Sequence, residues 1–430
     1  MNNCYLKKAF ATISFLVFYF TTSFAQPNYC SLFPRFDQEV FSTVLKTTDV
    51  VFGANSDYQG VNTILKMDIY QPASDTMSMR PLIIFAHGGS FIGGDKTNGD
   101  QVDLCNAFAK RGYVCATINY RLGFAFPINA ASATDAVFRA VQDMKAAIRF
   151  FRKDAATTNI YKINPTIVFA GGTSAGAFMA LHLAYLNTYA ELPSTVDTSV
   201  IGNLDGNSGN PGYPWNVNAV INLCGALGDR HWVVPGDVPL VSMHGTADNT
   251  VPYSTAMLFL LGSFPIMVVD GSYAIHNYIN TFNHPAEMYT YSGAPHVPFS
   301  GTSVANIAYM DTTVRFVSNF LYKYFGCTPS DPNPMQNTFT TTGTPEFIAD
   351  QEISLGLNPV NDFISLNQLD ESQYVFTISN ASGQVVLKSE KRAAEKRIEI
   401  SVSNLSDGIY FLHYKGVNKS GVLKVIVLHS

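Results

Sequence analysis

The sequence predicts a large α/β domain, with a mostly parallel sheet flanked by helices, followed by a small all-β sandwich. Continuous apolar runs at 81–86 and 113–120 are typical of strands buried on both faces. They alternate with helix-like segments at 102–110 and 132–155, and this order implies right-handed crossovers in a parallel sheet. From residue 353 onward, short alternating strands are separated by polar or glycine-bearing turns, which is the pattern of a β-sandwich.

The composition bounds the kind of protein. The chain has 430 residues, of which 47% are hydrophobic and 14% charged, so a large core can form. The formal net charge is −5 and there is no basic run, which argues against nucleic acid as a partner. No His or Cys cluster has metal-site spacing, so no metal is expected. After the N-terminal leader, no stretch approaches the ~20 apolar residues of a membrane helix, so no stable membrane span is expected.

The N-terminus is typical of a secretory signal peptide. Lys7 and Lys8 precede an apolar segment at 9–20, and Ser23-Phe24-Ala25 fits a small-x-small cleavage site. The alternative, an uncleaved anchor, is disfavoured because the apolar segment is short and no stop-transfer charges follow it. A polar segment rich in Pro and Thr begins near Ser330 and is typical of a linker. We therefore expect a signal peptide at 1–25, the α/β domain at 26–329, a linker at 330–350 and the β-sandwich at 351–430.

The cysteines suggest two candidate disulfides. Of the six cysteines, Cys4 lies in the predicted signal peptide, and the five that remain leave at least one thiol unpaired. Disulfides are allowed in an exported protein. Cys30 and Cys327 bracket the α/β domain, so a bond between them would tie its ends together. Cys105 with Cys115 is the other candidate, since a bond between them would link a helix to the strand that follows it.

The segment Gly172-Thr173-Ser174-Ala175-Gly176 has the G-x-S-x-G pattern, between a strand-like run at 166–170 and a helix-like run at 175–189. The two glycines let the helix pack against the strand while Ser174 holds a strained backbone. The hydroxyl would stand at the C-terminal edge of the sheet, where the helix N-terminus stabilises developing negative charge. Because so short a match also arises by chance in small-residue turns, other segments must decide its meaning.

A second glycine-rich segment, His87-Gly88-Gly89-Ser90-Phe91, directly follows the buried run at 81–86. Such a loop can turn backbone N–H groups inward and stabilise an oxyanion, together with the N–H of the residue after the nucleophile. The predicted donors are the N–H groups of Gly89, Ser90 and Ala175. The alternative is an ordinary glycine turn, and His87 is interpreted as a support for the loop rather than a proton carrier.

Two later loops can supply the acid and the base. Asp248 follows a buried strand at 240–243 and His296 follows a strand at 287–291, so the order Ser, Asp, His is complete. The aspartate would accept the imidazole N–H and fix its tautomer, while the histidine takes the serine proton and later returns it. The competing acids and bases, which lack a strand exit combined with a glycine-bearing loop, are Asp229, Asp270, His231, His276 and His284.

Other polar and aromatic residues have weaker assignments. The irregular loop at 196–215 is interpreted as part of a pocket wall, with Tyr213 and Trp215 as substrate contacts; a passive surface loop is the alternative. Asp135 and Asp143, on the helix at 132–155, are interpreted as capping and surface residues.

Together with Asn119-Tyr120-Arg121-Leu122-Gly123, these motifs resemble the α/β-hydrolase superfamily, in particular its carboxylesterase and hormone-sensitive-lipase-like branch, over about residues 35–326. Two positions depart from that branch: Ser90 replaces a third glycine, and Thr173 stands where Glu or Asp is common. The resemblance implies hydrolysis of an acyl ester through an acyl-serine, without a cofactor. The expected substrate is a small-molecule ester or, because the protein is expected to be exported from a bacterium, an ester linked to a polysaccharide. A catalytically inactive surface binding protein and a secreted serine peptidase are the alternatives. The complete triad disfavours the first, and the lack of a charged pocket for a peptide terminus disfavours the second.

The C-terminal domain resembles the sorting domain of the bacterial type IX secretion system, over about residues 353–430. The segments that carry this resemblance are 358–362, 379–386 and 404–410. It implies the type IX machinery as a partner and a location outside a Gram-negative cell, either secreted or at the cell surface. The alternative is a carbohydrate-binding sandwich with an exposed aromatic platform. The aromatic residues that could form one, Tyr410, Phe411 and Tyr414, are interpreted as core residues instead.

Overall fold

The computed structural model divides into two compact units, Met1–Asn337 and Thr338–Ser430. It describes residues 27–186, 188, 191–192, 202–260, 262, 264–331, 354–355, 360–367, 369, 373–380, 384–392, 397–416 and 420–429. The predicted signal peptide and most of the predicted linker lie outside these residues. Among the helices described, none has both the length and the apolar character needed to cross a bilayer.

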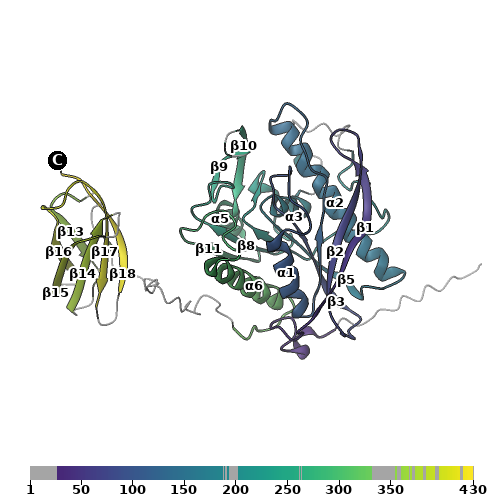
Figure 1. Cartoon of the computed structure of the whole chain (residues 1–430), viewed down its shortest axis with the longest axis horizontal. Coiled ribbons are helices and arrows are strands. Elements are labelled where there is room, and N and C mark those ends of the chain that lie inside the picture. Colours follow the sequence, from purple (N-terminus) through teal and green to yellow (C-terminus); the bar gives the residue numbers. More distant parts are fainter. Residues whose placement is uncertain are drawn as a thin grey trace, which may run out of the picture. The chain divides into compact units, whose positions relative to one another are not determined.

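The first unit is built on an eight-stranded sheet (Figure 1). Its strands are β1 (Val44–Ser56), β2 (Asn62–Pro72), β3 (Arg80–Ala86), β4 (Val114–Ile118), β5 (Ile163–Thr173), β6 (Ala219–Leu223), β8 (Leu240–Gly245) and β11 (Ala286–Tyr291). Their order is β1-β2-β4-β3-β5-β6-β8-β11. β2 pairs antiparallel with β1 and β4, whereas the strands from β4 to β11 are parallel. The predicted parallel sheet is confirmed, and its strands end at one common edge.

Helices cover both faces of this sheet. They are α1 (Gly99–Lys110), α2 (Ala130–Ala156), α3 (Ala175–Tyr185), α5 (Ser272–Ile279) and α6 (Val304–Tyr324), with short 3-10 turns η1 (Tyr29–Leu32), η3 (Arg230–Trp232) and η4 (Asn280–Phe282). Alternation along β3 separates two cores, because Leu82 and Ile84 pack with α2 and α3, whereas Ile83 and Phe85 pack with α1 and α6. α2 begins before the predicted residue 132, since the side chain of Asn129 caps its first turn.

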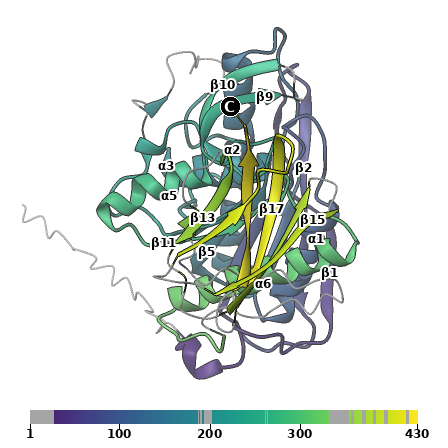
Figure 2. The same ribbon diagram turned by 90° about the vertical axis from the view of Figure 1, so that its left-hand side faces the viewer.

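A small second sheet lies beside the C-terminal edge of the main one. It has the order β7-β10-β9, from β7 (Ala226–Leu227), β9 (Thr255–Leu260) and β10 (Phe264–Gly271). β9 and β10 form an antiparallel hairpin, and residues 255–269 contain no charged side chain. The hairpin rises next to the start of α2 in both ribbon views (Figures 1 and 2), so these two elements flank the edge where the parallel strands end.

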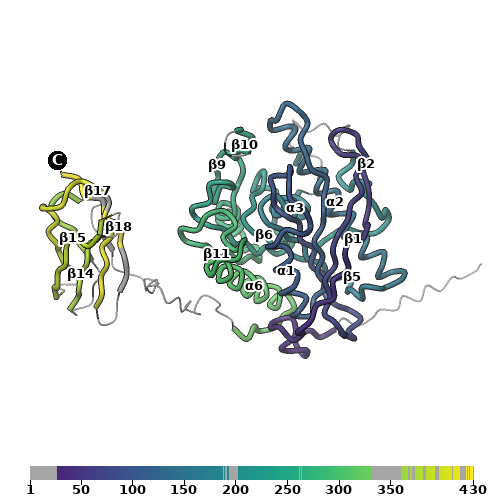
Figure 3. The backbone as a smooth tube through the Cα atoms, viewed as in Figure 1, coloured from purple at the N-terminus to yellow at the C-terminus, as the bar shows by residue number. Residues whose placement is uncertain are grey.

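The second unit is a separate all-β structure (Figure 3). Its strands are β12 (Ser354–Leu355), β13 (Phe363–Asn367), β14 (Gln373–Asn380), β15 (Val385–Arg392), β16 (Arg397–Ser401), β17 (Gly408–Lys415) and β18 (Ser420–Val427). They form sheets of order β12-β13-β16 and β15-β14-β17-β18, and the two sheets share one apolar core. Tyr410 and Tyr414 are buried in this core as predicted, whereas Phe411 is 37% exposed, because adjacent residues of a strand face opposite ways.

One of the two predicted disulfides is present. Cys30 and Cys327 are bonded, with Cα atoms 5.3 Å apart, so the two ends of the α/β unit are linked as predicted. Cys105 and Cys115 are free thiols, and the prediction of a bond between them is wrong. Cys105 in α1 and Cys115 in β4 are instead fully buried thiols of the same core, where burial raises the pKa of Cys115.

Candidate active site

The G-x-S-x-G segment forms a sharp turn between β5 and α3. Ser174 has φ 56° and ψ −117°, a conformation that non-glycine residues adopt at a cost. The glycines are needed for close packing, since a Cβ on Gly176 would lie 2.0 Å from the carbonyl oxygen of Ala86. The N–H of Ser174 donates to the carbonyl of Leu223 in β6 (2.9 Å), which fixes the turn. The hydroxyl is thereby held at the C-terminal edge of the sheet.

The predicted nucleophile, base and acid meet at this edge. Nε2 of His296 lies 2.9 Å from Oγ of Ser174, and Nδ1 of His296 lies 2.6 Å from Oδ2 of Asp248. Asp248 follows β8 and His296 follows β11, which are neighbouring parallel strands. Because a carboxylate only accepts hydrogen bonds, Nδ1 must carry the proton of the neutral ring, and Nε2 is free to accept the proton of Ser174. This is the tautomer that a general base requires.

Asp248 is held as a carboxylate by its neighbours. Its side chain is fully buried, and burial by itself raises the pKa. Hydrogen bonds from His244 and His296 outweigh this effect, so the net pKa of Asp248 lies below its ordinary value. The other oxygen, Oδ1, accepts the N–H groups of Thr250 (2.8 Å) and Val251 (2.9 Å). The carboxylate is therefore both charged and fixed in rotation.

The glycine-rich loop after β3 has an unusual backbone and passes beside Ser174. Gly89, Ser90 and Phe91 all have positive φ, at 119°, 55° and 60°, and the N–H of Gly93 donates to the carbonyl of Gly89 (3.0 Å). A Cβ on the preceding Gly88 would lie 3.2 Å from Cβ of Ser174, so this loop passes directly beside the hydroxyl.

The three predicted oxyanion donors differ from most backbone groups in lacking a partner. Among the residues that the structure describes, the N–H groups of Gly89, Ser90 and Ala175 donate to no other backbone group. Ala175 is the first residue of α3, where the N–H groups have no partner within the helix and the helix dipole is positive. These N–H groups are thus available to a negatively charged oxygen.

His87 supports this loop, as predicted. Its ring is almost fully buried, stacks on Tyr120 with ring centroids 4.4 Å apart, and has Nδ1 2.7 Å from the carbonyl of Gly88. The hydroxyl of Tyr120 donates to the carbonyl of His87 (2.9 Å). Burial lowers the pKa of His87, so the ring stays neutral and serves as a wall beneath the loop.

An apolar cleft opens at Ser174. It encloses about 870 Å³ of empty space, open solvent at its mouth included. Three walls form it: the glycine-rich loop after β3, the facing sides of α2 and α3, and the β9–β10 hairpin. Its lining includes Phe91, Phe124, Phe138, Phe178, His182, Leu186, Trp232, Leu258, Phe259, Met267 and Val269. Burial lowers the pKa of His182 to about 4, so this ring is neutral and the cleft carries no positive charge there.

The predicted pocket wall at 196–215 is wrong for its described part. Trp215 donates its indole N–H to Asp205 (2.7 Å), and the ammonium of Lys145 lies 3.5 Å from a Trp215 ring centroid. Neither Trp215 nor Tyr213 lines the cleft. The loop is held instead against α2, and the β9–β10 hairpin forms the wall of the cleft that this loop was predicted to form.

The competing acids and bases bond elsewhere. Asp270 forms an ion pair with Arg230 (3.1 Å), and Asp229 accepts from the ring of His231 (2.6 Å) at the surface. The other two histidines have buried partners of their own: His276 contacts Ser242 (2.9 Å) and His284 contacts the carbonyl of Val238 (3.0 Å).

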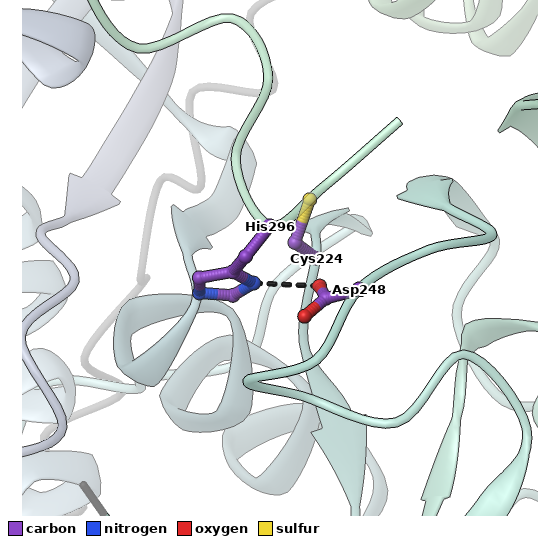
Figure 4. A group of neighbouring side chains, drawn as sticks. All are labelled: Cys224, Asp248 and His296. Atoms are coloured by element: carbon purple, nitrogen blue, oxygen red, sulfur yellow. Dashed lines mark hydrogen bonds and ion pairs between the residues drawn. The ribbon is translucent and has the colours of Figure 1, made fainter. Parts of the chain in front are cut away.

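Three neighbouring side chains, one of which is the predicted acid Asp248, carry atoms of the kind that ligate metals. Cys224, Asp248 and His296 offer ligand atoms within 4.8 Å of one another (Figure 4). However, Asp248 and His296 are already bonded to each other, and burial raises the pKa of Cys224 to about 12. Metal binding needs a thiolate. In this structure, two of the three potential ligand groups are thus already bonded to each other, and the third is a buried neutral thiol.

Sequence reasoning missed one residue at the site, His244. It lies at the end of β8, is fully buried, and contacts Oδ2 of Asp248 through Nε2 (3.1 Å). Its position in the sequence could have indicated this role, because His244 lies at the end of the strand that leads to Asp248, four residues before it.

Two regions of the chain match models of known protein families. The BD-FAE family model matches residues 67–228, and the model of the secretion system C-terminal sorting domain matches residues 358–428. The first region contains the glycine-rich loop after β3 and the Ser174 turn, and the second falls within the all-β unit.

Individual relatives are distant. Esterase-5C of Drosophila miranda is 28% identical over 148 residues, which are 34% of this chain and 25% of that protein. Neuroligin-like protein glit-1 of Caenorhabditis elegans is 30% identical over 115 residues, 26% of this chain and 15% of that protein. The chain thus spans a quarter or less of the length of these curated relatives. Among solved structures, Thermogutta terrifontis esterase 2 phosphorylated by paraoxon has 23% identity and a TM-score of 0.48, covering 65% of this chain and 94% of that one.

Proposed function

We propose that this chain, which joins an esterase-like α/β-hydrolase domain to a C-terminal secretion-sorting domain, is a serine carboxylic-ester hydrolase that acts outside the cell. The observation that carries the proposal is the continuous hydrogen-bond chain Ser174–His296–Asp248 at the mouth of an apolar cleft. The loop that carries Gly89 and Ser90 passes beside Ser174, and Ala175 is the next residue in the chain; among the described residues, the N–H groups of these three donate to no other backbone group. This combination supplies a nucleophile, a base of the correct tautomer and a site for an oxyanion.

Acylation begins with proton transfer from Ser174 to Nε2 of His296 as Oγ attacks the ester carbonyl. The carbonyl oxygen becomes an oxyanion and accepts the N–H groups of Gly89, Ser90 and Ala175. Asp248 stabilises the imidazolium that has formed. His296 then gives its proton to the departing alkoxide, which leaves as the alcohol and creates the acyl-serine.

Deacylation repeats the sequence with water. His296 takes a proton from a water molecule, whose oxygen attacks the acyl carbon, and a second tetrahedral oxyanion forms in the same site. The bond to Oγ of Ser174 breaks, the proton returns to Oγ, and the carboxylic acid is released. Every proton is handled by the chain's own residues, so no cofactor takes part.

The cleft favours an ester with an apolar acyl or aryl group. Phe178, His182 and Leu186 follow Ser174 at steps of four along one side of α3 and line the cleft. At about 1.5 Å per residue, His182 lies about 12 Å along the helix from the nucleophile. We propose polysaccharide-linked acyl esters as the natural class, since the sugar can remain in solvent while the acyl group enters the cleft. We expect kcat/KM for p-nitrophenyl esters to rise from acetate to medium-length acyl groups.

The test is hydrolysis of p-nitrophenyl esters by the full chain and by Ser174→Ala. We expect kcat to fall by at least about 10⁴-fold, because the variant has no nucleophile. Ser303→Ala is the matched control, since Ser303 is an exposed helix cap, and it should keep wild-type kcat. Wild-type activity in Ser174→Ala would refute the proposal. No turnover of any ester by the folded wild-type chain would favour the binding-protein alternative, and cleavage of peptides in preference to esters would favour the peptidase.

The location follows from the terminal segments. We propose that residues 1–25 direct export across the inner membrane and that the sorting domain hands the chain to the type IX machinery. Removing residues 358–428 from the gene should retain the enzyme in the periplasm, as fractionation with an activity assay would detect. Equal activity in the medium with and without these residues would contradict this part of the proposal.

A further inference from the structure

His244 occupies the far side of the acid, away from the cleft. It is the residue before the end of β8, and its side chain is fully buried. Nε2 lies 3.1 Å from Oδ2 of Asp248 and 3.2 Å from the carbonyl oxygen of Val251. Both partners can only accept, so the proton must be on Nε2. The ring therefore donates to the same carboxylate oxygen that His296 contacts.

The opposite ring nitrogen is fixed as well. With the proton on Nε2, Nδ1 of the neutral ring is an acceptor, and the hydroxyl of Ser272 lies 2.8 Å from it. Oγ of Ser272 in turn accepts from Nδ2 of Asn222 (2.9 Å). The amide of Asn222 is oriented because its oxygen accepts the N–H of Gly225 (2.9 Å). The hydroxyl of Ser272 can donate either to Nδ1 of His244 at 2.8 Å or to the carbonyl of Gly225 at 3.4 Å, and the shorter contact favours His244. The donors then run in one direction, from Asn222 through Ser272 and His244 to Asp248.

Asp248 consequently sits between two Ser–His pairs, Ser174–His296 and Ser272–His244, which meet at Oδ2. The pairs differ in access. The His296 side chain is 18% exposed and Ser174 lines the cleft, whereas neither His244 nor Ser272 has any exposed surface. Only the first pair can meet a substrate.

We propose that His244 is a positioning residue for the reaction, with Ser272 fixing its tautomer. Its N–H holds Oδ2 of Asp248 in line with Nδ1 of His296, while Thr250 and Val251 hold Oδ1. Without this donor, a buried carboxylate oxygen loses one of its two ring partners and the side chain gains freedom to turn away from His296. The inference rests on the proposed function, because it concerns the acid of that triad.

The expected effect is on kcat rather than on KM, since His244 does not line the cleft. His244→Leu should lower kcat by about 10- to 100-fold, because a misplacement of about 1 Å in a catalytic group costs about that much. His244→Gln keeps an N–H near the Nε2 position and should recover most of the lost kcat. Ser272→Ala keeps the ring but frees its tautomer, and a smaller loss of kcat is expected.

The experiment measures kcat and KM of the full chain for one p-nitrophenyl ester, with thermal unfolding of each variant. His284→Leu is the control, as His284 is a buried histidine bonded to the carbonyl of Val238 and remote from Asp248. One-dimensional proton NMR adds a readout of the His296–Asp248 bond, whose strongly deshielded Nδ1 proton should shift in His244→Leu and persist in His284→Leu.

Three results would overturn the inference: wild-type kcat in His244→Leu, equal losses in the Leu and Gln variants, or equal losses in His244→Leu and His284→Leu. If His244→Leu does not fold, His244→Gln and Ser272→Ala provide the test. In that case, a rise in KM with unchanged kcat in both variants would overturn the inference. These outcomes are distinct from failure of the proposed function, which would appear as turnover that does not depend on Ser174.

Discussion

The substitution Asp248→Asn removes the charge of the acid while keeping its shape. In the wild type, Oδ1 accepts two backbone N–H groups, from Thr250 and Val251, at 2.8 and 2.9 Å. The amide oxygen of Asn must take this position, since an NH₂ group there would oppose two donors. The NH₂ group is then forced to the Oδ2 position, where it faces Nδ1 of His296 and the N–H of His244.

An NH₂ group at this position reverses the tautomer of His296. Nδ1 becomes the acceptor, the ring proton moves to Nε2, and the ring cannot take the proton of Ser174. A triad with this wrong tautomer loses about 10⁴-fold in kcat, which corresponds to about 5.4 kcal/mol of activation free energy. The cleft is untouched, so KM should change little.

The assay is kcat for a p-nitrophenyl ester at neutral pH. Asp229→Asn provides the control, because Asp229 is a partly exposed carboxylate that also bonds a histidine, His231, but lies outside the triad. It should retain wild-type kcat. An Asp248→Asn enzyme within tenfold of the wild type, or an equal loss in Asp229→Asn, would refute the tautomer argument.

Three further predictions concern the loop, the disulfide and a buried histidine. Gly89→Ala should lower kcat by about 100- to 1000-fold, because a Cβ there would lie 2.2 Å from the carbonyl oxygen of Gly93 and φ is 119°; unchanged kcat would contradict the role of this loop. Replacing Cys30 and Cys327 by Ser should lower the free energy of unfolding by about 5 kcal/mol, since the bond closes a sequence separation of 297; urea unfolding measures it, and an unchanged midpoint would contradict it. The pKa of His182 is lowered by burial to about 4, so the associated stability is present above about pH 6.5 and is lost as the pH falls towards 4, by up to about 3 kcal/mol. Urea unfolding of wild type and His182→Gln across this window checks it, and equal slopes would show that His182 is not responsible.

The sequence was sufficient to place Ser174, Asp248 and His296 near one another because of sheet geometry. Continuous apolar runs predict parallel strands, and the C-terminal ends of parallel strands meet at one edge. Residues 122 and 48 positions apart therefore come into hydrogen-bond contact.

The sequence did not predict strands whose pattern of apolar residues depends on where the strand lies in the fold. β1 (Val44–Ser56) is a largely exposed edge strand with register shifts against β2, so its sequence lacks an apolar period. The β9–β10 hairpin is apolar on both faces, because one face lines the cleft while Met257 and Val268 on the other are exposed. Neither feature has a clean alternation from which a strand could be identified.

Charged and aromatic residues were misplaced where a distant partner decides their environment. Asp143 was expected at the surface of its helix, yet it is fully buried in an ion pair with Arg121 (2.9 Å). Trp215 was expected in the pocket but packs under Lys145. His244 was overlooked because its significance comes from a contact with Asp248 that only the folded loop creates. The contacts of Asp143 and Trp215 leave no local signal in a single sequence, whereas the position of His244 at a strand exit indicates that it lies near the site but not what it contacts.

The most direct measurement is mass spectrometry of the full chain quenched during turnover of a p-nitrophenyl ester. An acyl-serine mechanism predicts one acyl group per chain, located on the peptide that contains Ser174 and absent from Ser174→Ala. An acyl group on another residue, or continued turnover with no covalent species at any quench time and no block by a serine-directed phosphonate, would contradict the nucleophilic role of Ser174.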